Sequence, residues 1–500
     1  MSKISRRPGR EELKKQKKEK RQAEKELRER SGSAPHSTLP NRKSDYDTVE
    51  AEIEGRIDAV TGHLGYFQAK LPTLLRRLSK INDPRNPKKT KYKLTVVMIY
   101  GILMFVYQAS SRREANREMT NPIFIENLKL FFPDFEDLPH QDTLMRLLSR
   151  IDVNEIEKIH MELVRDLIRK KKFNRWLVNG QYPISMDGTQ KFKRNWLFSQ
   201  ECLERELKKG EESEKQYYVY VLEACLCFHN GLTIPLMSEF LVYSAGDYDR
   251  DKQDCELRAF KRLADRLKKE FPRLPIMVLL DGLYPNGPLT EICRKNKWGF
   301  MIILPDKCLP SVWNEYEGLK GMDGKNEYRQ KWGNRRQYFQ WVNQIQYHYE
   351  KGQMQIVHMV ICEEKWEDVD KTGATVSKRS RWVWLSSDPL TRRNVHERCN
   401  LAGRHRWNIE EGILVEKRHG YCYEHCFAYD WQAMTGYHYL MRLGHMFNIL
   451  AQYSSQLVKM VRTIGVRGWL RFIYQTMCGA CLDPVKVGAR LSSPYQLRLE

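Results

Sequence analysis

Two aspartates stand at the ends of short apolar runs, where their side chains could do chemistry. Asp187 ends an apolar run that begins at 184, and Asp281 follows the run 276–280. Such runs are typical of strands, so we expect two neighbouring strands to bring both carboxylates to one edge of a sheet. Because Mg²⁺ binds through one or two carboxylates and keeps positions for water and phosphate, the pair predicts a divalent cation site.

A third carboxylate lies in the segment 404–417, which is predicted to be a helix. At about 100° per residue, Arg406, Glu410 and Lys417 fall within roughly 40° of one another on one face. A salt-bridged helix surface would explain this triplet equally well in isolation, but the two aspartates favour a third metal ligand. Glu411 is about 100° away, so only one of the two glutamates can face the aspartates. We choose Glu410, which shares its face with the two cations.

The elements that must position these acids follow from the period of the apolar residues. The pattern is helical up to about residue 178 and changes to extended after Asn179-Gly180. A charged insertion occupies 204–215, and His229-Asn230-Gly231 is a hairpin signal. A separate β-rich block follows at about 325–394, and helices return after it. The extended part before this block predicts strands at 184–187, 217–228 and 232–243, a helix at 257–267, a strand at 276–280, a helix at 289–297 and a strand at 299–304.

The charge of the chain points to a polyanionic partner. Its 500 residues include 85 Lys+Arg against 63 Asp+Glu, which gives a net charge of +22. With 41% hydrophobic residues the body cannot be intrinsically disordered. Nucleic acid is the first candidate partner and an anionic membrane surface the second. The longest apolar run, 94–109, is shorter than the roughly 20 residues of a spanning helix, so we expect a buried helix and no membrane partner.

The N-terminal residues and the cysteines indicate in which cellular compartment the protein is expected. The N-terminal residues include no apolar stretch that could act as a secretory signal, so we expect a cytoplasmic protein with reduced cysteines. The 12 cysteines are scattered, and no second pair follows any close pair at the spacing of a zinc site. We therefore expect buried thiols and no zinc.

Basic residues before 178 are the candidates for sequence-specific DNA contacts. Arg112, Arg113 and Arg117 belong to one of the predicted helices, and Lys88 and Lys89 lie in a basic loop. Helices that carry such residues could enter a major groove. The alternative is a dimerisation or packing domain.

We therefore predict an α/β protein with a mixed-sheet core. A basic arm, helical or disordered, precedes a helical DNA-binding domain, and a β-rich insertion interrupts the core. The arm is either a DNA clamp or a solubilising tail. The predicted boundaries are 1–45 for the arm, 46–178 for the helical domain, 179–324 for the first part of the core, 325–394 for the insertion, 395–450 for the second part of the core and 451–500 for C-terminal helices.

Four stretches together resemble the DDE transposases of bacterial insertion sequences. The resemblance is to the group with a YREK motif and a β-rich insertion before its catalytic glutamate, and it covers most of residues 70–450. The stretches are Ser185-Met186-Asp187-Gly188, Leu279-Leu280-Asp281-Gly282, Arg406-Trp407-Asn408-Ile409-Glu410 with Lys417, and Gly420-Tyr421-Cys422-Tyr423-Glu424-His425.

The resemblance implies an RNase H-like catalytic core. Asp187, Asp281 and Glu410 would be the catalytic acids and hold two Mg²⁺ ions, with Mn²⁺ as a substitute, while Arg406 and Lys417 would bind DNA. The implied activity is cut-and-paste transposition. The enzyme would bind the inverted terminal repeats of its element, cleave the ends and join the 3′-hydroxyls to target DNA. We expect a homodimer in the DNA complex and a nucleoid-associated protein of the bacterial cytoplasm.

The sequence departs from the family motif at one position. The motif tyrosine, three residues before Arg406, is replaced by Gly403, and Tyr421 is a neighbouring aromatic that could take over its contact with DNA. The insertion is rich in tryptophan, and in relatives with hairpin intermediates such an insertion helps to stack a flipped base. Any single tryptophan is more often a core residue. The four in question are Trp332, Trp341, Trp382 and Trp384.

Two other classes of function remain open. The first is a domesticated DNA-binding protein without catalysis, against which the retention of all three acids argues. The second is an RNase H-like nuclease or resolvase, which would cleave without joining.

Overall fold

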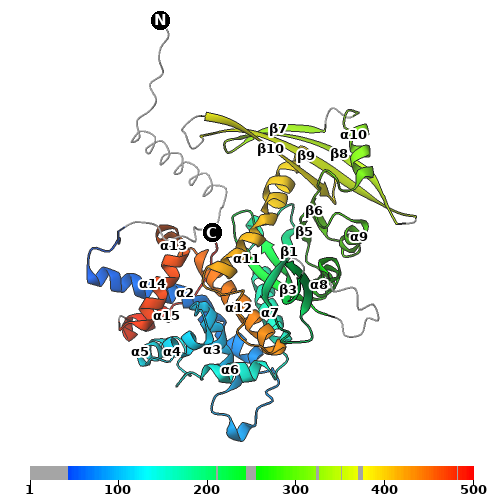
Figure 1. Ribbon diagram of the computed structural model, residues 1–500. Helices are drawn as coiled ribbons and strands as arrows, with labels where there is room; N and C mark the ends of the chain where they lie inside the picture. The colour runs from blue at the N-terminus through cyan, green and yellow to red at the C-terminus, as the bar shows by residue number, and fades with distance from the viewer. Residues whose placement is uncertain are drawn as a thin grey trace.

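The computed structural model describes residues 43–209, 212–243, 255–322, 326–350, 352–369, 375–480 and 482–500. In Figure 1 the helices of both chain ends gather below, the middle of the chain forms a sheet, and the β-rich insertion rises above it. The basic arm predicted for 1–45 lies outside the described residues except for its last three positions.

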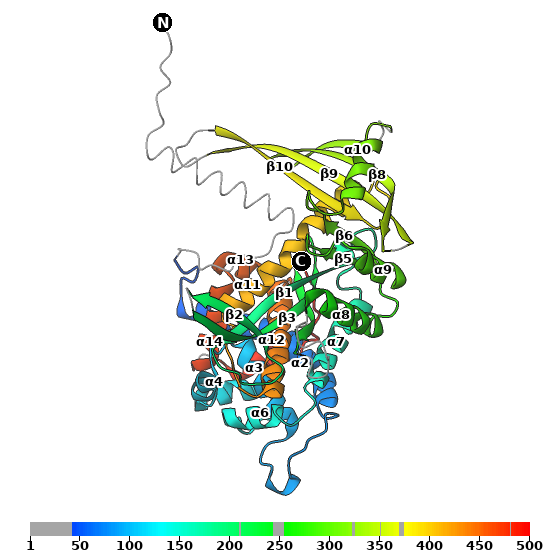
Figure 2. The same cartoon turned by 45° about the vertical axis from the view of Figure 1, so that its right-hand side comes forward.

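Helices dominate the chain up to residue 178, as the period of its apolar residues predicts. The run 94–109 forms α3 and its cap, and almost all of its residues are buried, so the prediction of a buried helix is confirmed. The loop between α2 and α3 (blue) projects at the bottom of Figures 1 and 2. The helices are α2 (Val49–Leu78), α3 (Leu94–Val106), α4 (Arg112–Met119), α5 (Pro122–Lys129), α6 (Gln141–Leu148) and α7 (Asn154–Arg169), with 3₁₀ turns η1 (Pro87–Lys89) and η2 (Asn174–Trp176).

Within the described residues, ten strands form one mixed sheet. The order is β2-β3-β1-β5-β6-β10-β9-β8-β7, and β4 pairs with β3 on the edge away from β1. The strands before the insertion are β1 (Tyr182–Arg194), β2 (Leu203–Lys209), β3 (Glu212–Cys227), β4 (Thr233–Leu241), β5 (Ile276–Leu280) and β6 (Gly299–Ile303). The predicted strands and the hairpin are thus present. Helices α8 (Glu256–Glu270) and α9 (Gly287–Lys295) lie between them in the chain.

The pairing of β1 sets the frame of the sheet. It runs antiparallel to β3, with Asp187 opposite Glu223, and parallel to β5, with Ser185 beside Leu279. Strand β5 is also parallel to β6. An α/β fold with a mixed sheet, as predicted, is therefore what the chain forms.

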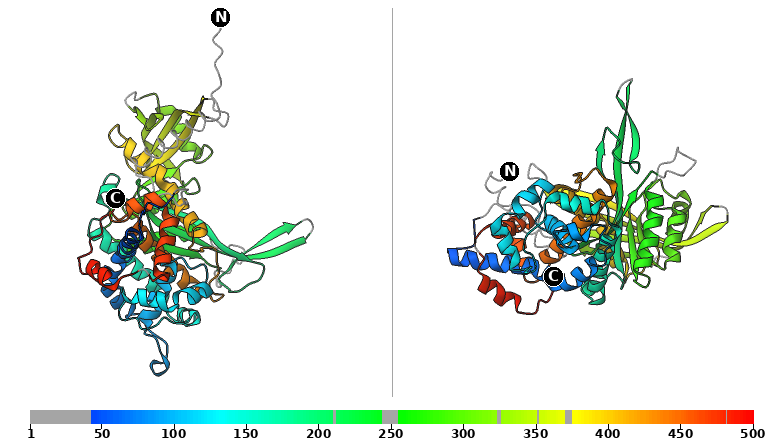
Figure 3. Two further views of the ribbon diagram at one scale, coloured as in Figure 1. Left: turned by 90° about the vertical axis from the view of Figure 1, so that its left-hand side faces the viewer. Right: turned by 90° about the horizontal axis from the view of Figure 1, so that it is seen from below.

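The charged segment 204–215, expected as an insertion between strands, forms part of a β-hairpin. Strands β2 and β3 pair along 203–218 and project from the body as a long green arm in Figure 3. Polar partners face each other across it: Lys215 and Glu204 form an ion pair of 3.8 Å, and the Arg205 guanidinium donates to Gln216. Such cross-strand pairs stabilise strands without apolar residues, a pattern that a hydrophobic period does not detect.

The β-rich insertion is not a separate sheet. Its strands β7 (Glu327–Trp332), β8 (Arg335–Tyr349), β9 (Gln353–Val369) and β10 (Thr375–Ser386) are antiparallel, as the alternation predicts, and α10 (Pro310–Leu319) packs on β8. Strand β10 also pairs with β6, which makes the insertion continuous with the rest of the sheet (Figure 2).

The predicted helix at 404–417 begins later than expected. Residues Glu397–Ala402 form the π turn η3, Gly403–Trp407 form the 3₁₀ turn η4, and only Asn408–Arg418 form the helix α11. The Arg404 side chain is bound to Glu364 of the insertion, and a Cβ at Gly403 would lie 2.8 Å from the Trp384 ring nitrogen. These contacts lie where the chain forms a 3₁₀ turn and not an α-helix.

The remaining helices close the core. They are α12 (Trp431–Gln452), α13 (Val458–Ile464), α14 (Val466–Cys478) and α15 (Pro484–Leu491). Nearly all of α12 is buried, and it packs against α2, α3, α6, α7 and β4. One hydrophobic core therefore contains residues from both chain ends and from the sheet. None of the described helices is both long and apolar enough to span a bilayer.

Candidate active site

Asp187 and Asp281 lie at the same level on neighbouring strands. The parallel register pairs Ser185 with Leu279, so two residues further along Asp187 comes level with Asp281, at the end of β5. Adjacent strands lie about 4.8 Å apart. The Asp281 side chain begins a turn, because its Oδ1 accepts from the N–H of Leu283 at 2.9 Å. The predicted convergence of the two aspartates is what the structure shows.

Arg406 joins the third acid to this pair. Its Nη2 forms an ion pair with Glu410, and its Nη1 lies 4.0 Å from Oδ1 of Asp187. The arginine is buried, and its Nε and Nη1 have no hydrogen-bond partner among the described residues. One guanidinium thus faces carboxylates from β1 and α11. We call Asp187, Asp281, Glu410 and Arg406 the acid edge.

The acid edge carries more negative than positive charge. Burial raises the pKa of Asp187 to about 7. The Arg406 guanidinium opposes this rise, whereas the charges of Glu410, Asp281 and Glu256 add to it. The side chain of Asp187 retains 20% of its exposed surface, so this charge can be reached from outside. A positive ion placed here would relieve the repulsion.

The two adjacent glutamates of α11 point to different neighbours. Glu410 contacts Arg406, whereas the charge of Glu411 acts on Tyr453, which follows α12. Lys417, seven residues after Glu410, donates to the carbonyl of Gln190 in β1 at 3.1 Å. The structure therefore places Glu410, and not its exposed neighbour, at the acid edge.

Lys417 is held beside the edge by its own counterion. Its Nζ lies 3.0 Å from Oε1 of Glu424, and 5.8 Å from the ring of Tyr423. A phosphate that approached Lys417 would compete with the exposed Glu424 carboxylate.

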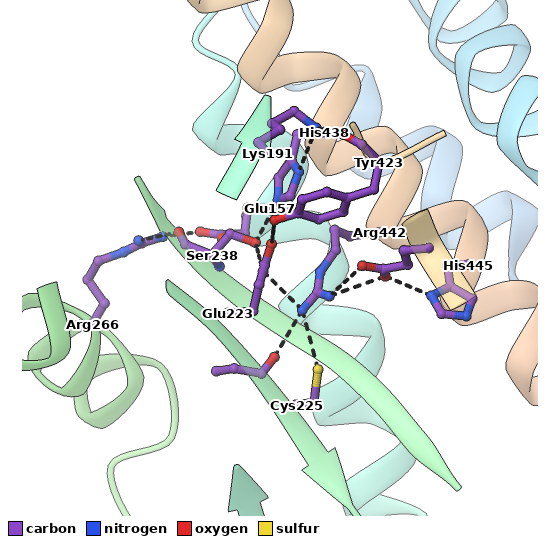
Figure 4. A network of polar contacts seen from close by, with 12 residues as sticks. Glu157, Lys191, Glu223, Cys225, Ser238, Arg266, Tyr423, His438, Arg442 and His445 are labelled. Atoms are coloured by element: carbon purple, nitrogen blue, oxygen red, sulfur yellow. Dashed lines mark hydrogen bonds and ion pairs between the residues drawn. The ribbon is translucent and has the colours of Figure 1, made fainter. Parts of the chain in front are cut away.

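A second group of carboxylates begins at Glu223, which lies opposite Asp187 on β3 and is fully buried. Figure 4 shows this group from close by. Arg442 of α12 forms ion pairs with Glu223 of β3 at 3.2 Å and with Glu416 of α11 at 3.1 Å. His445 contacts the other oxygen of Glu416 at 2.7 Å. Burial alone would raise the pKa of Glu223, but Arg442 and His438 hold it below its ordinary value. Arg442 thus ties the helix that carries Glu410 to the strand beside Asp187.

Further hydrogen bonds join the other residues of this group to Glu223. The hydroxyls of Tyr423 and Ser238 donate to Glu223 at 2.7 and 2.6 Å. Lys191 donates to the carbonyl of Tyr423 at 2.9 Å, and burial lowers its pKa to about 8. His438 stands 2.9 Å from Ser238. We call these residues the buried network: Lys191, Glu223, Ser238, Glu416, Tyr423, His438, Arg442 and His445.

The donor set of the acid edge fits Mg²⁺ in its chemistry. Carboxylate oxygens are the ligands that this ion takes from proteins, usually one or two at a site, with water and phosphate as the rest. Asp187 and Asp281 supply such a pair, whereas the unpartnered N–H groups of Arg406 need an acceptor such as a phosphate oxygen. In the part of the chain that the structure describes, no three His, Cys, Asp or Glu side chains form a group that could hold one ion.

The predicted DNA contacts of the N-terminal region lie at different distances from the acid edge. Burial lowers the pKa of His425, and the positive charges of Arg194, Lys191 and Arg112 lower it further. Arg112 therefore lies near the segment that follows α11. Arg113 and Arg117 are exposed on α4. Lys88 and Lys89 are exposed on η1, in the loop that projects at the far end of the molecule (Figure 1).

The aromatic residues are arranged around position 403. Trp384 occupies the space that a side chain at Gly403 would need, and the Trp382 ring stacks on it at 5.8 Å. The guanidinium of Arg404 lies 4.8 Å from Trp382 and 5.1 Å from Trp332. Trp341 and Trp384 are buried. Tyr421 is also buried and bonded to Asn448, so it offers no ring to DNA in place of the motif tyrosine.

Comparison with known families agrees with a transposase-related protein. Residues 75–164, from the end of α2 into α7, match the family model described as DDE_Tnp_1-associated. No curated protein matches the chain. The matched segment lies in the helical region and does not include the acid edge.

Proposed function

We propose that the protein is a DDE transposase that cleaves the ends of its own element and joins them to target DNA. The observation that carries this proposal is the acid edge: two aspartates level on parallel strands, with Glu410 joined to them through Arg406. The match of residues 75–164 to a transposase-associated family supports it independently.

We further propose that the core is RNase H-like. Supporting this is the order β4-β3-β1-β5-β6, in which β4, β3 and β1 are antiparallel and β1, β5 and β6 are parallel. Along the chain, the five strands of this core are β1, β3, β4, β5 and β6. The aspartates belong to the first, β1, and to the end of the fourth, β5.

The residues of the acid edge would have different roles in the reaction. Asp187, Asp281 and Glu410 would hold two divalent cations, which supply positive charge for the phosphoryl transfer when bound. Arg406 would contact phosphate oxygens through Nε and Nη1, the atoms that have no partner among the described residues. Lys417 would add a point charge once DNA replaces Glu424 as its neighbour. DNA as partner, a homodimer in the complex and Mg²⁺ or Mn²⁺ as cofactor belong to this proposal.

The test uses the full chain and the DNA that flanks its gene. We expect imperfect inverted repeats in these flanks, bounded by a short duplication. With a supercoiled plasmid carrying them, the purified protein in Mg²⁺ should release 3′-hydroxyl ends and give products joined to target DNA. Cleavage without joined products would favour the nuclease alternative, and binding without cleavage the non-catalytic one. Either result would overturn the proposal.

Two matched variants test the choice of glutamate. Glu410→Gln should abolish nicking of a bound end and leave DNA binding intact, because this side chain lies at the acid edge. Glu411→Gln, one residue away and exposed, should nick like the wild type. The reverse pattern would assign the role to Glu411.

A further inference from the structure

Glu256, which the sequence does not single out, lies beside the acid edge. It is the first residue of α8, where the helix N-terminus favours a negative side chain. A Cβ at Gly188 would overlap its Oε1 atom. The absence of a side chain directly after Asp187 therefore makes room for this carboxylate.

Two tyrosine hydroxyls donate to Glu256, one to each oxygen. Tyr220 of β3 donates to Oε1 at 2.5 Å, and Tyr284 donates to Oε2 at 3.0 Å. Tyr284 is fully buried, and its ring packs on Phe260 of α8 with centroids 5.7 Å apart. Glu256 thus connects β3 to the segment that follows β5.

That segment is the turn which carries Asp281. The N–H of Tyr284 donates to the carbonyl of Asp281 at 3.3 Å, and the N–H of Leu283 donates to its carboxylate at 2.9 Å. A Cβ at Gly282 would lie 2.5 Å from Pro305, so the turn has little room to move on that side. Fixing Tyr284 therefore fixes the direction of the Asp281 side chain.

We infer that Glu256 is a positioning residue: by accepting from Tyr284, it holds the Asp281 turn so that Asp281 stays level with Asp187. The inference rests on the proposed function for the role of the aspartate pair. It concerns the geometry of that pair, however, so cation binding tests it as directly as cleavage does.

The test uses Mn²⁺ alone as the probe and the full-length protein. The readout is the Mn²⁺ concentration that gives half of the maximal rise in the unfolding midpoint. Glu256→Ala and Tyr284→Phe should each raise this concentration at least fivefold, because the turn is released. Glu256→Gln should stay within twofold of the wild type, since an amide can accept from one hydroxyl and donate to the oxygen of the other.

Tyr220→Phe is the matched control. It removes a hydrogen bond of the same carboxylate but leaves the Asp281 turn attached, so its Mn²⁺ requirement should stay within twofold of the wild type. Gly188→Ala gives a second route, because its methyl group would displace Glu256 while all donors remain, and it should behave like Glu256→Ala.

The outcomes separate this inference from the proposed function. If Glu256→Gln weakens Mn²⁺ binding as much as Glu256→Ala, the role belongs to the charge and positioning is overturned. Equal effects of Tyr220→Phe and Tyr284→Phe would also overturn it. A wild-type protein that binds Mn²⁺ with the expected variant pattern but does not cleave DNA would remove the proposed function and leave the inference standing. No effect of Mn²⁺ on the wild type would overturn the inference.

Discussion

Two groups of carboxylates lie on one face of the same sheet, and their surroundings differ. Asp187 and Glu223 are directly opposite each other on β1 and β3. In the buried network, two carboxylates, Glu223 and Glu416, are matched by the cations Arg442 and Lys191. At the acid edge, Arg406 contacts two carboxylates, Asp187 and Glu410, and the negative charges of Asp281 and Glu256 also act on Asp187.

The difference shows where added positive charge can be accommodated. The oxygens of Glu223 and Glu416 already accept hydrogen bonds from side chains of β4, of α12 and of the loop between α11 and α12. The acid edge has an acid, Asp187, whose pKa is raised to about 7, whereas Arg442 and His438 hold the pKa of Glu223 in the buried network below its ordinary value. A buried charge that is balanced serves structure, whereas one that is left unbalanced is suited to bind a cation or a phosphate.

The largest expected effect is the loss of Arg442. Arg442→Met would leave Glu223 and Glu416 buried without their shared cation, which costs about 3–5 kcal/mol for a pair of this kind. We expect a large fall in the urea midpoint of unfolding. Arg379→Met, which removes an exposed cation of β10, is the control and should change stability by less than about 0.5 kcal/mol. Equal stability of the two variants would erase the contrast between the two groups.

The opposite sign is expected at the acid edge. The pKa of Asp187 in the folded state, about 7, lies above its ordinary value of 3.8. Its ionised form therefore destabilises the fold, with no cost below about pH 4, a growing cost up to pH 7 and the full cost above. Asp187→Asn should be more stable than the wild type at pH 8 by about 1–3 kcal/mol. This gain should vanish near pH 4, and chemical denaturation at both pH values measures it.

A gain that is independent of pH would contradict this account of Asp187. The Glu411→Gln variant serves as the control, because its side chain is exposed and lies away from the acid edge.

The smallest effect concerns the counterion of Lys417. Glu424→Gln should free Lys417 for phosphate and tighten binding to a random-sequence duplex about two- to fivefold at fixed salt, as exposed ion pairs are weak. Lys417→Met should reduce the slope of log K against log[salt] by about 0.9. Fluorescence anisotropy at several salt concentrations measures both. If Glu424→Gln does not change the affinity and Lys417→Met keeps the wild-type slope, Lys417 does not contact DNA.

The placement of the two aspartates at one edge of the sheet could be predicted because its signals are local. Asp187 and Asp281 each end a run whose composition indicates a strand, and parallel pairing of neighbouring strands brings them level. The choice of Glu410 over Glu411 assumes one continuous helix from 404, whereas Arg406 lies in the 3₁₀ turn η4. The structure still places Glu410 beside Arg406.

What the sequence does not predict depends on contacts between distant segments. Glu256 and Tyr220 are 36 residues apart and Arg442 and Glu223 more than 200, with no spacing rule to connect them. The 3₁₀ turn before α11 contains Arg404, which is bound to Glu364 of the insertion, and this contact has no sequence signal either. The pairing of β10 with β6 is another contact between segments that are distant in the sequence.

One measurement tests most directly the claim that the acid edge is completed by divalent cations. The protein is first treated with a chelator, and its unfolding midpoint is then followed as Mn²⁺ is added. At an Mn²⁺ concentration tenfold above the dissociation constant, the wild type and Glu411→Gln should gain about 1.4 kcal/mol. Asp187→Asn and Asp281→Asn should gain nothing. Equal gains in all four proteins, or none in the wild type, would contradict the claim.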